Sequence, residues 1–181
     1  MKKLLILLVL AILPILTFAD FQIGPTAMYN FVFNDPTWSE VPKPNSLSDF
    51  TFGADARLNF GIIQATGYAL INPGSVTGLV YMPTVVKLYT DIGLCVDIFF
   101  VRLGAGIGPN FNFVFSDPNA PTKPDMFQLG LNFKAAVDFS LGGIALSLVY
   151  LTDFNLTQSG VAKLFEKIDG NIGLSVLFKL F

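Results

Sequence analysis

The sequence predicts an all-β protein, a transmembrane, eight-stranded, antiparallel up-and-down β-barrel that follows a cleaved N-terminal signal peptide. Three observations support this prediction. Hydrophobic residues make up 52% of the 181-residue chain and charged residues only 13%, yet beyond residue 19 no uninterrupted apolar run is long enough for a membrane-spanning helix. Apolar and polar residues instead alternate with a period of two along eight segments. The connections between these segments are alternately long and short.

The N-terminus has the form of a secretory signal peptide. A short basic start precedes an apolar run from Leu4 to Leu16, and Ala19 stands before Asp20. This order of positive charge, apolar core and small exit residue is typical of export signals, so we expect cleavage after Ala19. An uncleaved N-terminal anchor is the alternative. The predicted organisation is a signal peptide over 1–19 and an outer-membrane β-barrel domain over 20–181.

Eight segments show the alternation expected of strands with one apolar face. They cover 21–33, 50–60, 62–71, 86–98, 101–115, 127–139, 144–152 and 171–181. In the second segment, for example, apolar residues occupy the even positions and polar or small residues the odd ones. The third and seventh segments are weaker signals because both of their faces are fairly apolar. A strand of about 11 residues tilted by ~40° covers roughly 28 Å of height, which matches the apolar thickness of a bilayer.

The lengths of the connections predict the topology. Long connections follow the first, third, fifth and seventh segments, and tight turns lie near 60–62, 98–100 and 141–143. Long outer loops and short periplasmic turns are typical of barrels in the bacterial outer membrane, so we expect both termini on the periplasmic side. Within the last long connection, 161–168 has helical spacing and is interpreted either as a short surface helix or as an extension of a strand.

The first and fifth segments resemble one another. Ile23-Gly24-Pro25 is echoed by Ile107-Gly108-Pro109, and each tripeptide is followed by a Phe-Val-Phe run that leads into Asp-Pro. The spacing differs by two residues, which leaves every side chain on the same face. Either a four-stranded half was duplicated, or two aromatic strands are similar by chance.

Every charge in the most regular strands falls on one face. These residues are Asp55, Arg57, Lys87, Asp91, Asp97, Arg102, Lys134 and Asp138. This face is predicted to line the lumen as a charge network, because a charged side chain at the lipid midplane costs about 2–4 kcal/mol. Several glycines share the face, and we expect Gly93 to accept serine far more readily than outward-facing Leu94 accepts arginine.

The barrel region as a whole resembles the small eight-stranded outer-membrane barrels of bacteria, the OmpA/OmpX/OmpW class. No motif selects one family, and the OmpW-like branch is one candidate. The sharpest element of the resemblance is the C-terminus, where Gly173 precedes alternating apolar residues, including Phe178, up to Phe181. The resemblance implies that these residues form the signal that the barrel-assembly machinery reads, although Phe181 shares the face of Lys179. It also implies outer-membrane lipid and periplasmic chaperones as partners.

Catalytic, cofactor-binding and metal sites are not predicted. The chain has no histidine, the usual general base and a common metal ligand, and the lipid A-modifying barrels of the resembled class need one. Cys95 is interpreted as a small filler, and pairing with neighbouring cations is favoured over a metal or acid-pair role for Asp91 and Asp97. The formal net charge of −2 does not favour nucleic-acid binding.

Two functions remain for such a barrel. The first is a structural or surface-interaction barrel whose lumen is largely filled by side chains and whose outer loops bind a host ligand. The alternative is a narrow, porin-like pore for small or hydrophobic solutes, which the interior glycines and mixed charges suggest. We favour the closed barrel because balanced charges in a narrow lumen pair more readily than they stay solvated. A soluble periplasmic binding barrel, with its apolar face inward, is a third reading.

Overall fold

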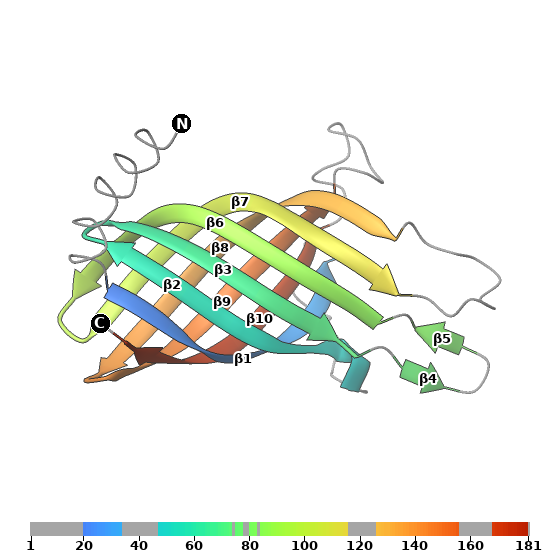
Figure 1. Ribbon diagram of the computed structural model, residues 1–181, viewed down its shortest axis with the longest axis horizontal. Coiled ribbons are helices and arrows are strands. Elements are labelled where there is room, and N and C mark those ends of the chain that lie inside the picture. The colour runs from blue at the N-terminus through green and yellow to red at the C-terminus, as the bar shows by residue number, and fades with distance from the viewer. Residues whose placement is uncertain are drawn as a thin grey trace, which may run out of the picture.

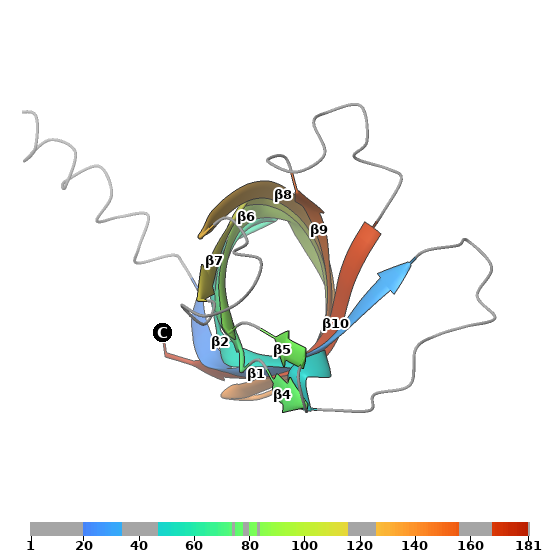
Figure 2. The same cartoon turned by 90° about the vertical axis from the view of Figure 1, so that its right-hand side faces the viewer.

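Eight long antiparallel strands form a closed barrel in the computed structural model (Figure 1). The structure describes residues 20–33, 47–73, 75–77, 80–82, 84–115, 126–155 and 168–180. The strands follow one another around the barrel in the order β1-β10-β9-β8-β7-β6-β3-β2, and pairing of β1 with both β2 and β10 closes the sheet into a ring (Figure 2). The predicted all-β, eight-stranded antiparallel barrel is confirmed.

The strand bounds agree with the alternation in the sequence. The barrel strands are β1 (Asp20–Phe33), β2 (Phe50–Phe60), β3 (Ile63–Asn72), β6 (Thr84–Ile98), β7 (Val101–Phe115), β8 (Phe127–Leu141), β9 (Ile144–Asn155) and β10 (Ile168–Lys179). A 3-10 turn, η1 (Leu47–Asp49), precedes β2, and a small hairpin of β4 (Ser75–Thr77) and β5 (Val80–Met82) forms a separate sheet. β9 and β10 reach further toward the long connections than predicted, because Asp153 and Asp169 continue the ladder between them. Of the segment with helical spacing, 161–167 lies outside the described residues and Ile168 begins β10.

Two-residue turns join strands at one end of the barrel. Gly61-Ile62, Phe99-Phe100 and Gly142-Gly143 lie at the three predicted turn positions. The first residue of each turn has a positive φ, at 58° for Gly61, 57° for Phe99 and 75° for Gly142. Tight hairpins need this left-handed backbone, which glycine adopts freely and a phenylalanine adopts at a cost of about 1–2 kcal/mol. The described chain also begins and ends here, since the Leu180 backbone N–H donates to the Phe21 carbonyl at 2.9 Å.

The two faces of the barrel wall differ as the alternation predicts. Along β8, Asn132, Lys134 and Asp138 are buried in the lumen, whereas Leu131 and Phe133 on the alternate positions are exposed on the outside. Within the described barrel strands, every charged residue stands on the inward phase. The outer surface of the wall is therefore an apolar band.

No helix among the described residues is long and apolar enough to cross a bilayer.

The two Gly-Pro pairs of the repeated tripeptides have the same effect on the sheet. The ladder between β1 and β10 skips Gly24 and Pro25, and the ladder between β6 and β7 skips Gly108 and Pro109. Proline has no N–H to contribute to a ladder. The glycine before each proline lies very close to the neighbouring strand. A Cβ on Gly24 would come within 1.7 Å of the Val176 carbonyl oxygen, and a Cβ on Gly108 would come within 1.9 Å of the Thr90 carbonyl oxygen. The repeated Ile-Gly-Pro tripeptide thus occurs at two positions where the strand ladder is interrupted in the same way.

Candidate functional site: the charged lumen

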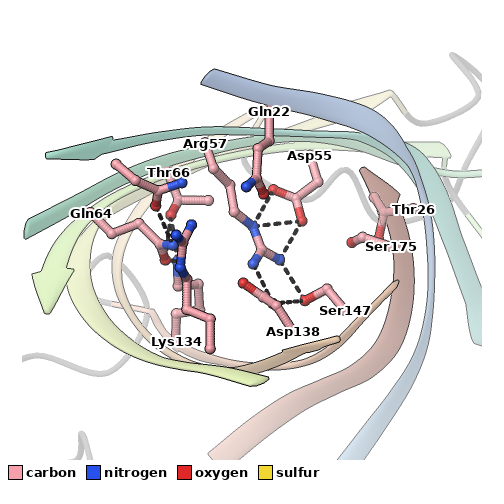
Figure 3. A network of polar contacts seen from close by, with 12 residues as sticks. Gln22, Thr26, Asp55, Arg57, Gln64, Thr66, Lys134, Asp138, Ser147 and Ser175 are labelled. Atoms are coloured by element: carbon pink, nitrogen blue, oxygen red, sulfur yellow. Dashed lines mark hydrogen bonds and ion pairs between the residues drawn. The ribbon is translucent and has the colours of Figure 1, made fainter. Parts of the chain in front are cut away.

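Arg57 on β2 is the centre of the interior charge network. Its side chain is fully buried, with a relative exposure of 0%. Nη2 of Arg57 lies 2.7 Å from Oδ2 of Asp55, and Nη1 lies 2.7 Å from Oδ1 of Asp138. Nη2 also donates to the Ser147 hydroxyl at 2.8 Å, and that hydroxyl donates to Asp138. Figure 3 shows the guanidinium between Asp55 on one side and Asp138 with Ser147 on the other.

The Arg57–Asp138 ion pair crosses the barrel. β2, which carries Arg57, and β8, which carries Asp138, are four steps apart in either direction around the ring, so they lie on opposite walls. A contact of 2.7 Å between their side chains places a charged bridge across the full width of the lumen. An eight-stranded barrel has an interior just wide enough for side chains to fill, and here they do so with an ion pair.

Lys134 forms a second buried group beside this bridge. Nζ of Lys134 donates to Oε1 of Gln64 at 2.5 Å and to the hydroxyl of Thr66, and it lies 3.3 Å from Oδ1 of Asp91. Lys134 has a relative exposure of 1% and Asp91 of 3%. Burial of a charge costs several kcal/mol unless a partner and hydrogen bonds compensate. Both buried cations have such partners, so five of the eight predicted lumen charges form one compact layer.

An apolar layer lies next to the charges on the side of the long connections. Met28, Leu70 and Leu151 point inward and are 0% exposed. Tyr68 and Tyr89 belong to the same buried cluster and meet edge to face with ring centroids 6.4 Å apart. The weak alternation of β3 and β9 in the sequence is thereby explained, because these strands supply inward-facing apolar residues to the layer.

Lys87 pairs with a residue that the sequence did not single out. Its Nζ lies 3.1 Å from Oδ2 of Asp153, which also accepts a hydrogen bond of 2.8 Å from the Tyr89 hydroxyl. Oδ1 of Asp153 accepts a hydrogen bond of 3.0 Å from the Asn110 amide. Asp153 lies one residue beyond the predicted end of its strand, which is why its inward phase was missed.

The remaining two predicted charges lie at the end of the barrel with the short turns. Arg102 Nε donates to Oδ1 of Asp97 at 2.5 Å, and Nη1 reaches Oδ2 of Asp20 at 3.4 Å. Asp20 also lies 3.6 Å from Nζ of Lys179. The Asp97 side chain is 57% exposed at the mouth of the barrel, whereas Arg102 is 14% and Asp20 18% exposed. Asp20 and Lys179 were not predicted as part of it.

Several interior glycines are required by backbone packing rather than by an open passage. A Cβ on Gly53 would lie 1.9 Å from the Ala69 carbonyl oxygen, and a Cβ on Gly93 would lie 1.8 Å from that of Ala105. The neighbouring strand β7 therefore resists serine at position 93, and the comparison with Leu94→Arg stays a prediction. The alternation placed Gly93 on the correct face but contained no information about strand separation.

The residues of the expected C-terminal signal lie on β10 and just beyond it. A Cβ on Gly173 would lie 2.3 Å from the Ala27 carbonyl oxygen, so its small size has a packing reason of its own. Phe178 faces outward and is 45% exposed. Phe181 lies outside the described residues, so the assembly signal stays a prediction.

The described residues contain no cluster of three or more side chains suited to hold a metal ion. Cys95 is buried at 2% exposure and its thiol faces the Gly61 carbonyl at 3.5 Å.

This geometry defines the fold class of the small, eight-stranded barrels known from bacterial outer membranes. No protein-family model and no curated protein sequence matches the chain. Among solved structures it is similar to Ail, the attachment invasion locus protein of Yersinia pestis, with a TM-score of 0.54 and 14% identity over 90% of this chain and 97% of Ail.

Two further structures give similar values. Neisserial surface protein A matches with a TM-score of 0.57 and 14% identity, over 90% of this chain and 99% of the other. Outer membrane protein H from Pseudomonas aeruginosa matches with a TM-score of 0.57 and 14% identity, over 89% and 99%. At this level of identity, the similarity concerns the fold.

Proposed function

We propose that this protein is a closed barrel of the bacterial outer membrane, and that its loop-bearing end contacts molecules outside the cell. The observation that supports closure is the 2.7 Å contact between Arg57 and Asp138, which lie on opposite walls of the lumen. A side-chain bridge across the lumen, with the Lys134 group beside it, gives the charged layer a structural role. The activity of the protein then belongs to its loop-bearing end.

Two further observations favour the closed barrel over a narrow pore. The apolar layer of Met28, Leu70 and Leu151 lies beside the charged layer and is fully buried, which disfavours passage of a solvated ion. Gly53 and Gly93, whose small size suggested an open lumen, instead allow close approach of neighbouring strands. The charged and apolar fillings of the interior thus support a closed barrel.

The outer face supports placement in a membrane. Leu94, Ile107 and Leu174 point outward with relative exposures of 61%, 62% and 63%. A continuous apolar band of this kind is too large to stand in water, whereas in a barrel of the outer membrane it meets lipid. We propose that 1–19 directs export and that Gly173, Phe178 and Phe181 are read by the barrel-assembly machinery.

The orientation is tested by cysteine labelling in intact cells. In a Cys95→Ser background, Thr77→Cys places a thiol in the hairpin of β4 and β5, at the end with the long connections. Gly143→Cys places a matched thiol in a short turn, where a Cβ meets nothing within 4 Å. We expect a membrane-impermeant maleimide to label the first variant in intact cells and the second only after lysis. The reverse pattern, or recovery of the protein without detergent, would contradict the proposal.

A further inference from the structure

We propose that the loop-side lumen binds a neutral, hydroxyl-rich ligand, such as a sugar, through a ring of amide side chains. The outer amide ring, as we name it, consists of Asn30, Asn72, Asn110, Asn112 and Asn171, together with the hydroxyl of Thr51. The inference rests on the proposed function, because it assigns a ligand class to the loop-bearing end of a closed barrel.

The ring lies directly above the apolar layer. Asn30 is the next inward position after Met28 along β1, and Asn72 is the next after Leu70 along β3. On β9 the corresponding position after Leu151 is Asp153, the partner of Lys87. The apolar layer therefore forms a floor and the next inward positions form a polar wall, at the end with the long connections.

Hydrogen bonds and the strand register connect the ring around the barrel. Asn110 on β7 donates to Asp153, and Asn112 stands opposite Lys87 in the register of β6 and β7. Asn171 on β10 stands opposite Asn30 on β1, whose Oδ1 accepts a hydrogen bond of 3.3 Å from Thr51.

β8 contributes no side chain to the ring, because its residue at this position is Gly130. A Cβ on Gly130 would lie 2.2 Å from Oδ1 of Asn110, so the glycine leaves room for that amide.

Three asparagines of the ring, Asn110, Asn112 and Asn171, have unused hydrogen-bonding capacity. Asn171 is 1% exposed, and neither its Oδ1 nor its Nδ2 has a hydrogen-bond partner. Oδ1 of Asn110, also 1% exposed, and Oδ1 of Asn112 lack partners as well. A buried polar group without a partner costs about 1–3 kcal/mol. Four of the eight buried side-chain atoms that lack a partner among the described residues lie on these three asparagines in the loop-side half of the lumen, and a ligand there would complete them.

The chemistry of the ring selects the ligand class. Lys87 and Asp153 lie 3.1 Å apart and neutralise one another, so neither a cation nor an anion gains a net counter-charge. An apolar ligand would leave the amides without partners. A hydroxyl group both donates and accepts, as the unpaired oxygens and nitrogen of the ring require. The floor of Met28, Leu70 and Tyr89 can pack against the C–H face of a sugar ring.

A binding role and a structural role predict opposite effects of one substitution. Asn171→Leu keeps the size of the side chain and removes two unpartnered atoms, so we expect the barrel to become more stable while ligand binding falls. Asn59→Leu is the matched control. Asn59 is 3% exposed but fully engaged, accepting from Gln64 at 2.7 Å and donating to the Asp20 carbonyl at 3.3 Å. It lies in the other half of the lumen, so its replacement lowers stability and leaves binding unchanged.

Titrations of the full mature barrel in lipid nanodiscs, followed through the ¹⁵N–¹H signals of the side-chain amides, test the proposal. The probes are glycerol, glucose and sucrose, with glucose 6-phosphate as the anionic comparison. We expect saturable shifts of the Asn110 and Asn171 signals with at least one neutral probe, and weaker binding of the phosphate ester. Loss of a pair of neutral hydrogen bonds in Asn171→Leu is expected to weaken binding about tenfold.

Three results would overturn the inference. The first is no saturable shift with any neutral probe, which would mean that the amides hold water only. The second is tighter binding of glucose 6-phosphate than of glucose. The third is unchanged affinity in Asn171→Leu. Ion current through the same preparation is recorded in parallel. Current would show that the closed barrel of the proposed function is wrong. An absence of both shifts and current would show that only the sugar site is wrong.

Discussion

Arg57→Met removes the cation at the centre of the lumen while keeping a side chain of similar length. Asp55 and Asp138, whose side chains are 0% and 3% exposed, then face one another without their shared partner. Lys134 cannot replace Arg57, because its ammonium group is already bound by Gln64 and lies beside Asp91. Breaking a buried ion pair by removing one partner costs about 3–5 kcal/mol, since it leaves an uncompensated charge. We therefore expect Arg57→Met to lower the free energy of unfolding by about that amount.

Arg102→Met is the matched control for this variant. Arg102 makes comparable contacts, including 3.0 Å from Nη2 to Oδ2 of Asp97, but the Asp97 side chain is 57% exposed. Solvent can replace Arg102 at this exposed carboxylate, so the expected loss is smaller than for Arg57→Met. Arg57→Met combined with Asp55→Asn and Asp138→Asn removes the uncompensated charges as well. This triple variant is expected to recover much of the loss, because effects within one network are not additive.

Equilibrium urea unfolding of the barrel in lipid vesicles measures these differences. The folded fraction is read from the heat-modifiable band on a gel and from the β-sheet signal in circular dichroism. Equal losses for Arg57→Met and Arg102→Met would refute the reasoning, because burial would then have no effect on the strength of the pair. A triple variant no more stable than Arg57→Met would also refute it.

Three further predictions follow from the wall of the barrel. Leu94→Arg, which puts a charge on the outward face, is expected to cost up to about 2–4 kcal/mol in lipid, whereas Cys95→Ser on the lumen side is tolerated. Equal folding yields of the two variants would reverse our assignment of the faces. Gly108→Ala is expected to lower the free energy of unfolding by about 1–3 kcal/mol, because its Cβ would meet the neighbouring strand. Gly67→Ala is the control: its Cβ meets nothing closer than 3.9 Å, so we expect it to be neutral or slightly stabilising in the same urea assay. Deletion of Phe181 is expected to lower insertion and to leave periplasmic aggregates, and normal membrane levels by fractionation would contradict the C-terminal signal.

The sequence predicted the side of the wall on which each residue lies, but not its partner. A period of two follows directly from the pleat of a strand, so Arg57 and Lys134 could be assigned to the lumen from alternation alone. The partner of Arg57 across the lumen depends on the register of every intervening strand pair. Asp138 lies 81 positions away in the sequence, and no local pattern connects the two.

Other features were missed for equally physical reasons. Asp20 and Asp153 lie at strand ends, where the alternation of apolar and polar residues becomes irregular. The sequence therefore does not show whether these side chains face the lumen or the outside. The requirement for glycine at position 93 arises from the approach of a neighbouring strand, which a one-dimensional pattern does not contain. The amides of the outer ring could not be predicted from the sequence, because asparagine in a strand near a loop is commonly a turn signal. Only the structure shows that Asn110 and Asn171 are buried and have polar atoms without a hydrogen-bond partner.

The central claim is that side chains close the lumen, and single-channel recording in a planar bilayer tests it most directly. The refolded barrel is first shown to be heat-modifiable on a gel, so that only folded protein is measured. The bridge between Arg57 and Asp138 and the apolar layer beside it predict a folded, inserted protein that passes no discrete steps of current. Reproducible current steps from the heat-modifiable form would contradict the account and would establish a pore through the layer of charges.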